Sequence, residues 1–170
     1  MKKYTIPFFL VGSLVMVYVM TKTGAPLKTP GTPHGILNLE FAYNTTKATA
    51  VIDAWAPSDN IAAAKLNTWL DFLFLLFYSP FLFFAGKKIA GTFNGTVAKA
   101  GRLIARGALL AGFLDILENI GMLLSLNGHI SGSTAFLTIF FSVIKWALAL
   151  IAVLYVLTGV LVLGYRKIKN

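Results

Sequence analysis

Residues 112–128 read GFLDILENIGMLLSLNG, an apolar stretch that nevertheless holds Asp115, Glu118 and Asn119. An ionisable side chain at the centre of a bilayer costs about 2.5–3.5 kcal/mol, so membrane helices turn such side chains towards the protein interior. The stretch therefore predicts a membrane-spanning helix that packs against other helices. It also predicts that the polar residues of this helix share that interior with polar residues of its neighbours.

The whole chain has the composition of a membrane protein. Of its 170 residues 57% are hydrophobic and only 12% are charged, and the mean hydropathy is +0.76. Four apolar blocks, at about 4–21, 66–86, 107–126 and 135–164, are each long enough for a helix to cross the hydrocarbon core. Strand-like alternation is not sustained anywhere, which disfavours a barrel. We predict one all-α membrane domain over residues 1–170, a four-transmembrane-helix bundle with a large loop at about 22–65.

The composition also excludes several kinds of function. Cysteine is absent, which removes disulfide and thiol chemistry, and the two histidines, His34 and His129, lie far apart in predicted loops. A metal site is therefore not expected. There is no phosphate-binding Gly-rich loop, no H-E-x-x-H motif and no nucleophile elbow, so we expect no cofactor and assign no catalytic residue.

The net charge of +9 is explained by topology, and we expect no nucleic acid partner. The positive-inside rule places short basic loops in the cytoplasm, so both termini are predicted to be cytoplasmic, in the inner membrane of a bacterium. The first block follows MKK like a signal peptide, but its apolar run is long and no A-x-A site follows, so we expect it to remain. Ten of the fifteen basic residues fall on one predicted side: Lys2, Lys3, Lys87, Lys88, Lys99, Arg102, Arg106, Arg166, Lys167 and Lys169.

Three of these basic residues suggest contact with lipid. Lys99, Arg102 and Arg106 are spaced so that they share one face of a helix. A basic helix face next to the membrane attracts anionic lipid headgroups. We therefore expect membrane lipids among the partners of this chain.

The loop at about 22–65 is too apolar for a flexible linker. Three prolines between residues 26 and 33 preclude a regular helix there, whereas Asn44 or Thr45 is placed to cap a helix that ends before Pro57. Ser58 is a candidate cap for a further helix that continues into the second span. We expect the loop to pack over the outer mouth of the bundle or to lie in the interface, with Glu40 and His34 as candidates to reach the mouth.

Helical periodicity assigns an inward face to each polar span. On the third span the small and polar residues share one face and the bulky apolar residues the other, as expected where helices pack in lipid. The second span repeats this pattern, and the fourth places Lys145 on its more polar face. The inward residues of the third span are Ala108, Ala111, Gly112, Asp115, Glu118, Asn119, Met122 and Ser125, and those of the second are Asn67, Asp71, Tyr78 and Ser79.

These faces predict a polar pocket inside the bundle. Counted back from Arg166 at about 1.5 Å per residue, Lys145 lies about 31 Å away, near the outer boundary. It is either an interfacial anchor together with Trp146 or folds down towards Glu118 or Asp71. The predicted ligand pocket consists of Asp71, Asp115, Glu118, Asn119, Tyr78, Asn67, Lys145 and Trp69.

Three functions fit such a pocket, and a fourth interpretation is that the acids only fix the register of the helices. The first is binding of an amphipathic or lipid-like ligand. The second is a membrane enzyme that uses paired carboxyl groups on a lipid or isoprenoid. The third is an accessory subunit of a larger membrane complex or a homo-oligomer. We favour a binding or accessory role without chemistry.

Three stretches carry a resemblance: GILNLEFA at 35–42, LDFLFLLFY at 70–78 and GFLDILEN at 112–119. They are similar to stretches of a group of small, uncharacterised four-span bacterial membrane proteins. The similarity covers roughly residues 35–126. It implies the four-span architecture and no particular activity.

Overall fold

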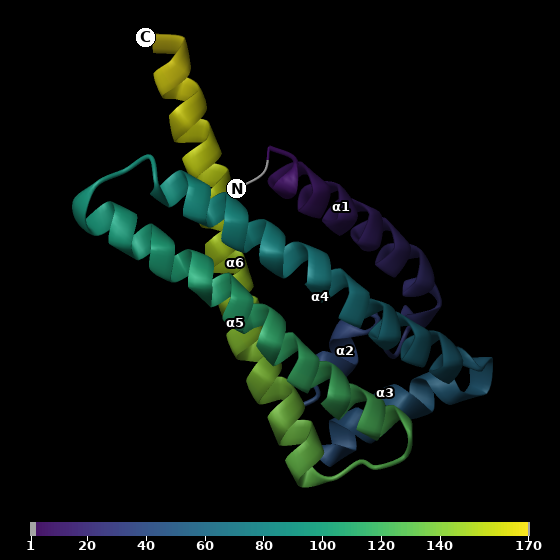
Figure 1. Ribbon diagram of the computed structural model, residues 1–170. Coiled ribbons are helices and arrows are strands. Elements are labelled where there is room, and N and C mark those ends of the chain that lie inside the picture. The colour runs from purple at the N-terminus through teal and green to yellow at the C-terminus, as the bar shows by residue number, and fades with distance from the viewer. Residues whose placement is uncertain (1–2, 170) are drawn as a thin grey trace.

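The computed structural model describes residues 3–169, and in this range it is helical apart from turns and one isolated bridge between Thr29 and Thr32. Lys2, counted above among the basic residues, lies outside the described residues. The four long helices are α1 (Thr5–Thr23), α4 (Asn60–Ala90), α5 (Gly95–Leu126) and α6 (Gly132–Lys169) (Figure 1). The short elements are η1 (Ala25–Leu27), α2 (Leu37–Glu40), α3 (Thr45–Trp55) and η2 (Ala56–Ser58).

Within residues 3–169, four helices are long and apolar enough to cross a membrane, which agrees with the predicted number of spans and indicates a multi-pass membrane protein. The helices extend beyond the apolar blocks. α5 begins at Gly95, whereas the predicted span begins at about residue 107. The extra turns carry the basic residues at helical spacing, because a helix continues past the hydrocarbon boundary wherever its residues favour helix.

Helix α4 is the centre of the bundle. It lies between α1 and α5, and α6 packs against both α5 and α4 (Figure 1). α1 packs mainly against α4. Two glycines of α5 let its neighbours approach: a Cβ at Gly112 would lie 2.6 Å from Ser79 Oγ on α4, and one at Gly121 would meet Thr138 on α6. Small residues at such crossings are how membrane helices pack closely.

The inward face predicted for α5 is confirmed. Every residue assigned to it is buried, from Ala108 to Ser125. The bulky residues on the opposite face, such as Leu110 and Phe113, are exposed. The polar residues of this helix therefore point into the bundle.

Residues 24–59, here called the cap, fold over one end of the bundle. Trp55 is fully buried and its indole N–H donates to the Leu27 carbonyl oxygen at 2.9 Å and to Thr32 Oγ1 at 3.0 Å. The apolar core of the cap continues onto α5 through Met122 and Leu126. The cap is thus a packed unit with a core of its own, shared with one end of a spanning helix.

The predicted helix caps are partly correct. Asn44 caps α3, its side chain accepting from the Lys47 backbone N–H at 2.9 Å. The prediction that Ser58 caps the next helix is wrong, because Ser58 belongs to η2 and Asp59 stands at the start of α4. Pro57 forms a short 3-10 turn, which moves the start of α4 on to Asn60.

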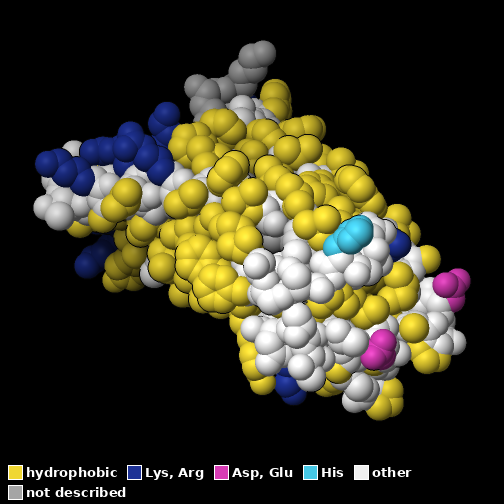
Figure 2. Space-filling model, turned by 90° about the horizontal axis from the view of Figure 1, so that it is seen from below, with side chains coloured by type: hydrophobic (Ala, Val, Ile, Leu, Met, Phe, Trp, Pro, Cys, Tyr) yellow, Lys and Arg dark blue, Asp and Glu magenta, His cyan; other side chains and the backbone are white. Residues whose placement is uncertain are grey.

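Charged side chains are distributed unevenly along the molecule. Figure 2 shows hydrophobic side chains over most of the visible surface, with most of the Lys and Arg side chains gathered at one end. That end carries the start of α5 and the end of α6, and the cap lies at the other. The two ends therefore differ in charge as the sequence pattern predicts.

Candidate functional site

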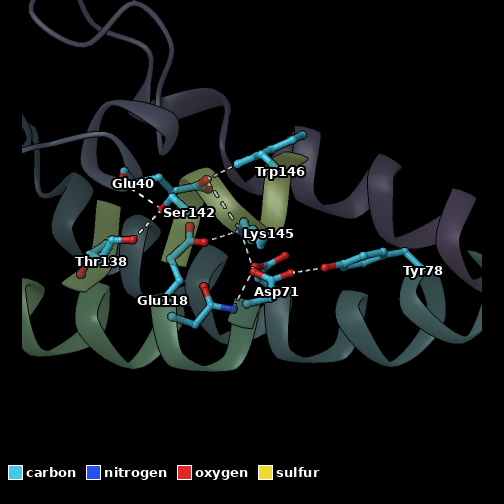
Figure 3. A network of polar contacts seen from close by, with 10 residues as sticks. Glu40, Asp71, Tyr78, Glu118, Thr138, Ser142, Lys145 and Trp146 are labelled. Carbon is cyan, nitrogen blue, oxygen red and sulfur yellow. Dashed lines mark hydrogen bonds and ion pairs between the residues drawn. The ribbon is translucent and has the colours of Figure 1, made fainter. Parts of the chain in front are cut away.

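Lys145 on α6 is the centre of a buried polar cluster (Figure 3). The residue is 6% exposed, and its Nζ lies 2.6 Å from Asp115 Oδ1, 2.9 Å from Glu118 Oε2 and 3.7 Å from Glu40 Oε2. Of the two placements predicted for this lysine, the interfacial anchor is wrong, and the lysine instead folds down towards Glu118. The close crossing of α5 and α6 brings the long lysine side chain within reach of both acids of α5.

Asp115 ties the three central helices together. One of its carboxyl oxygens holds Lys145 of α6, and the other accepts a hydrogen bond of 2.7 Å from the Tyr78 hydroxyl of α4. Asp115 is 2% exposed. A buried carboxyl group with both oxygens occupied fixes the geometry of its surroundings, because moving any partner leaves a polar atom unsatisfied.

Asp71 on α4 is bound differently. Its Oδ2 accepts a hydrogen bond of 2.9 Å from the Asn119 side-chain N–H of α5. Within the described part of the chain, Asp71 has no cation at ion-pair distance. Asp71 is therefore part of the cluster through a hydrogen bond and not through an ion pair.

Glu40 reaches the cluster from the cap. Its Oε2 accepts from the Trp146 indole N–H at 3.0 Å, and its backbone carbonyl oxygen accepts from the Ser142 hydroxyl at 3.0 Å. Glu40 and α6 are thus joined through both side chain and backbone. The sequence marks Glu40 as a lone acid in an apolar stretch, although the predicted pocket does not include it.

Some polar atoms of the cluster have no partner among residues 3–169. These atoms are Glu118 Oε1 and Asn119 Oδ1, and both residues are 0% exposed. Glu118 Oε2 contacts Lys145 as an ion pair without hydrogen-bond alignment. Buried polar atoms are nearly always satisfied in proteins, so the cluster has acceptor capacity that the chain itself leaves unused.

Acids outnumber bases in the cluster. Its four carboxyl groups belong to Glu40, Asp71, Asp115 and Glu118, and its one ammonium group belongs to Lys145. Carboxyl groups this close cannot all be ionised in a medium of low dielectric constant unless positive charge is added. The surplus negative charge is relieved either by protonation of a carboxyl group or by a cation from outside the chain.

A cavity of about 590 Å³ opens beside the cluster, between α1, α4, α6 and the cap. Polar side chains gather at its end under the cap, from Glu40, Asn67, Asp71, Asp115 and Lys145, together with Lys28 and His34 of the cap. The rest of its lining is mostly apolar. The apolar lining comes from three helices: Leu10, Leu14 and Val17 of α1, Phe81 and Leu82 of α4, and Leu150 and Val153 of α6. We call this cavity the groove.

The predicted pocket residues are mostly brought together. Asp71, Asp115, Tyr78 and Lys145 line the groove, and Glu118 and Asn119 lie behind them, fully buried. Asn67 lines the same groove near α1, where its amide donates to the Met20 carbonyl oxygen at 3.0 Å and to Thr23 Oγ1 at 2.8 Å.

The structure does not place Trp69 with these residues. It is 61% exposed and packs on Phe72 with 5.4 Å between ring centroids. Two residues before Asp71 correspond to about 200° around a helix, so Trp69 faces the opposite way. Trp146, the residue next to Lys145, supplies the indole that the groove does contain.

Lys99, Arg102 and Arg106 lie on the exposed side of α5, at the end away from the cap. They share no surface with the groove. Among residues 3–169, no three His, Cys, Asp or Glu side chains are grouped to hold a metal ion. The two sets of predicted site residues are thus separate features of the molecule.

Models of known protein families, characterised proteins and solved structures give no match to this chain. The resemblance to small four-span bacterial proteins stays a prediction. The three stretches that carry it converge in space: the first contributes Glu40, the second Asp71 and Tyr78, and the third Asp115 and Glu118.

Proposed function

We propose that this protein binds one amphipathic, lipid-like molecule in the groove. The hydrocarbon chain of the ligand lies between α1 and α6, and its polar head lies at the acidic cluster under the cap. The observation that carries the proposal is a single, mostly apolar cavity of about 590 Å³ whose charged and amide side chains gather at the end under the cap. Ligand sites in proteins have this character, being mostly apolar with a few convergent polar groups.

The order of residues along α4 supports this orientation of the ligand. Asn67 and Asp71 line the polar end, Tyr78 follows, and Leu82 lines the apolar end. From Asn67 to Leu82 the helix rises about 22 Å at 1.5 Å per residue. A hydrocarbon chain of a membrane lipid fits along such a distance, because the whole apolar core is only about 30 Å thick.

The proposed topology places the polar end of the groove near the outer surface of a bacterial inner membrane. The basic ends of α4, α5 and α6 are opposite the cap, which by the positive-inside rule makes both termini cytoplasmic. Because the chain has no cysteine, single-cysteine variants report the topology directly. Ser58→Cys in the cap should react with an impermeant thiol reagent on intact cells, and Lys88→Cys only after lysis; the reverse pattern contradicts this topology.

A matched pair of neighbouring substitutions tests the binding proposal. Val153 lines the groove, whereas Leu154 is 63% exposed and is not among the residues that line it. Val153→Trp should fill the apolar part and Leu154→Trp should leave it open. The measurement is native mass spectrometry of protein purified in a neutral detergent from bilayers of known lipid composition.

The wild-type protein and Leu154→Trp should retain one lipid-like molecule per chain, and Val153→Trp should lose it. If the wild-type protein carries no bound amphiphile, the proposal is wrong. Equal retention by the two tryptophan variants would place any bound lipid outside the groove.

A further inference from the structure

The apolar part of the groove contributes little free energy to the transfer of a ligand from the bilayer into the groove. Lipid tails are as apolar as Leu10 or Leu150, so burying a hydrocarbon chain between α1 and α6 releases little free energy. Selectivity must therefore come from the polar end. The chemistry of that end identifies the head group.

We infer that the groove selects amphiphiles with a positively charged amine head, and that the Asp71 carboxyl group is the counter-ion of that head. This inference rests on the proposed function. Asp71 lines the groove and, within the described part of the chain, has no cation at ion-pair distance. Its Oδ2 is oriented by the Asn119 amide, which holds the carboxyl group in one position.

The other carboxyl groups of the cluster are already engaged. Asp115 holds Lys145 with one oxygen and Tyr78 with the other. Glu40 is held by the Trp146 indole, and Glu118 lies behind Lys145, 0% exposed. Asp71 is the acid that a head group in the groove meets without displacing an ion pair of the chain.

The hydrogen-bonding capacity that Asp71 offers to the groove is of the acceptor type. Asn119 donates to Asp71 through its nitrogen and, like Glu118, lies behind the groove with no exposed atoms, so a head group meets the carboxyl oxygens of Asp71. An ammonium group has three donors and no acceptor, so it complements such a site. A carboxylate or phosphate head brings only acceptors and further negative charge, which the cluster disfavours.

Aromatic side chains complete the surroundings of the head. Phe74 and Tyr78 follow Asp71 by three and seven residues on the same face of α4, and both line the groove. Their ring centroids are 4.9 Å apart. Trp146 lines the groove from α6. Aromatic faces attract ammonium groups, most strongly where water is excluded.

Three probes share one saturated sixteen-carbon chain, about the length of a lipid tail, and differ only in the head group. They are hexadecylamine, hexadecanol and hexadecanoic acid, so any difference in their affinity comes from the head. Each is added at the same mole fraction to phosphatidylcholine nanodiscs that hold the protein, and occupancy is read by native mass spectrometry. The amine should bind about tenfold more tightly than the alcohol, since hydrogen bonds to a charged partner exceed neutral ones by about that factor. The acid should bind more weakly than the alcohol.

Asp71→Asn should reduce the affinity for the amine about tenfold and leave that for the alcohol unchanged. The control is Asp59→Asn, which removes an exposed acid of the cap and should change neither. If the wild-type protein binds the amine no better than the alcohol, the inference is wrong, and this comparison needs no variant to fold. An Asp71→Asn protein that folds and keeps the amine preference also overturns it.

Val153→Trp distinguishes a failure of amine selection from a failure of the proposed function. If Val153→Trp abolishes binding of both amine and alcohol while the head groups are not distinguished, the groove binds lipid without selecting amines. If no probe binds in a manner that Val153→Trp abolishes, the proposed function itself is wrong.

Discussion

Replacement of Lys145 by methionine tests whether the acidic cluster depends on its single ammonium group. Methionine keeps an unbranched side chain of similar length and removes the charge. Lys145 Nζ has two carboxyl oxygens within 2.9 Å and a third at 3.7 Å, and the residue is 6% exposed. Removing one partner of a buried ion pair costs about 3–5 kcal/mol, because an uncompensated charge remains. We expect Lys145→Met to lower the free energy of unfolding by this amount.

The measurement is reversible unfolding by sodium dodecyl sulfate in mixed micelles, followed by tryptophan fluorescence. The control Lys88→Met alters an exposed lysine of α4 and should change the free energy of unfolding by less than about 0.5 kcal/mol. Glu118→Gln gives a second readout. In the wild-type background it should destabilise by about 1–3 kcal/mol, because Lys145 loses a partner.

In the Lys145→Met background the sign should reverse, because Glu118→Gln then removes an unpaired buried acid. If Lys145→Met lowers the free energy of unfolding by less than about 1 kcal/mol, the cluster does not depend on its ammonium group. The same effect of Glu118→Gln in both backgrounds would also contradict this dependence.

Three further predictions concern packing, the cap and the membrane surface. Gly112→Ala should destabilise the bundle by about 1–3 kcal/mol, because its Cβ would lie 2.6 Å from Ser79 Oγ; Ser79→Gly should recover part of the loss. Trp55→Phe should raise the protease sensitivity of residues 24–59, since losing a buried donor costs about 1–3 kcal/mol. Neutralising three basic residues should weaken the binding of neutral nanodiscs that hold the protein to anionic vesicles by about 1 kcal/mol each at low salt, as sedimentation would measure. These residues are Lys99, Arg102 and Arg106.

Each of these predictions has a control within the chain. Gly164→Ala places a Cβ where nothing lies within 4 Å and should not destabilise. Trp69→Phe removes an exposed indole and should leave the cap intact. A destabilised Gly164→Ala, a cap unaffected by Trp55→Phe, or vesicle binding that ignores salt would contradict the respective explanation.

The inward face of α5 was predictable from the sequence alone. Asp115, Glu118 and Asn119 cannot face lipid cheaply, so helical periodicity together with the cost of an exposed charge fixes which side is buried. The same argument applied to α4 turns Asp71 and Tyr78 towards α5. The hydrogen bond of 2.7 Å from Tyr78 to Asp115 therefore joins two helix faces that the sequence assigns to the interior.

Other parts of the site depend on contacts that no local pattern contains. The sequence does not determine whether Lys145 reaches the acids of α5. Depth counted along one helix does not say where that helix crosses its neighbour. Glu40 reaches the cluster only because the cap folds around Trp55 and Thr32 and docks on Ser142. Trp69 is predicted to supply an aromatic face to the pocket, but it precedes Asp71 by two residues, which turn a helix through more than half a circle.

The geometry of the cluster also bears on whether its acids only hold helices together. A purely structural network satisfies its polar groups within the protein, since each unsatisfied one costs free energy in low dielectric. Asp115 meets that condition, because both of its oxygens have partners from neighbouring helices. Asp71 does not, since it lines the groove and has no cation at ion-pair distance within residues 3–169. Asp71 thus presents the groove with a carboxyl group that helix packing does not use as an ion-pair partner, and an incoming donor with positive charge complements it.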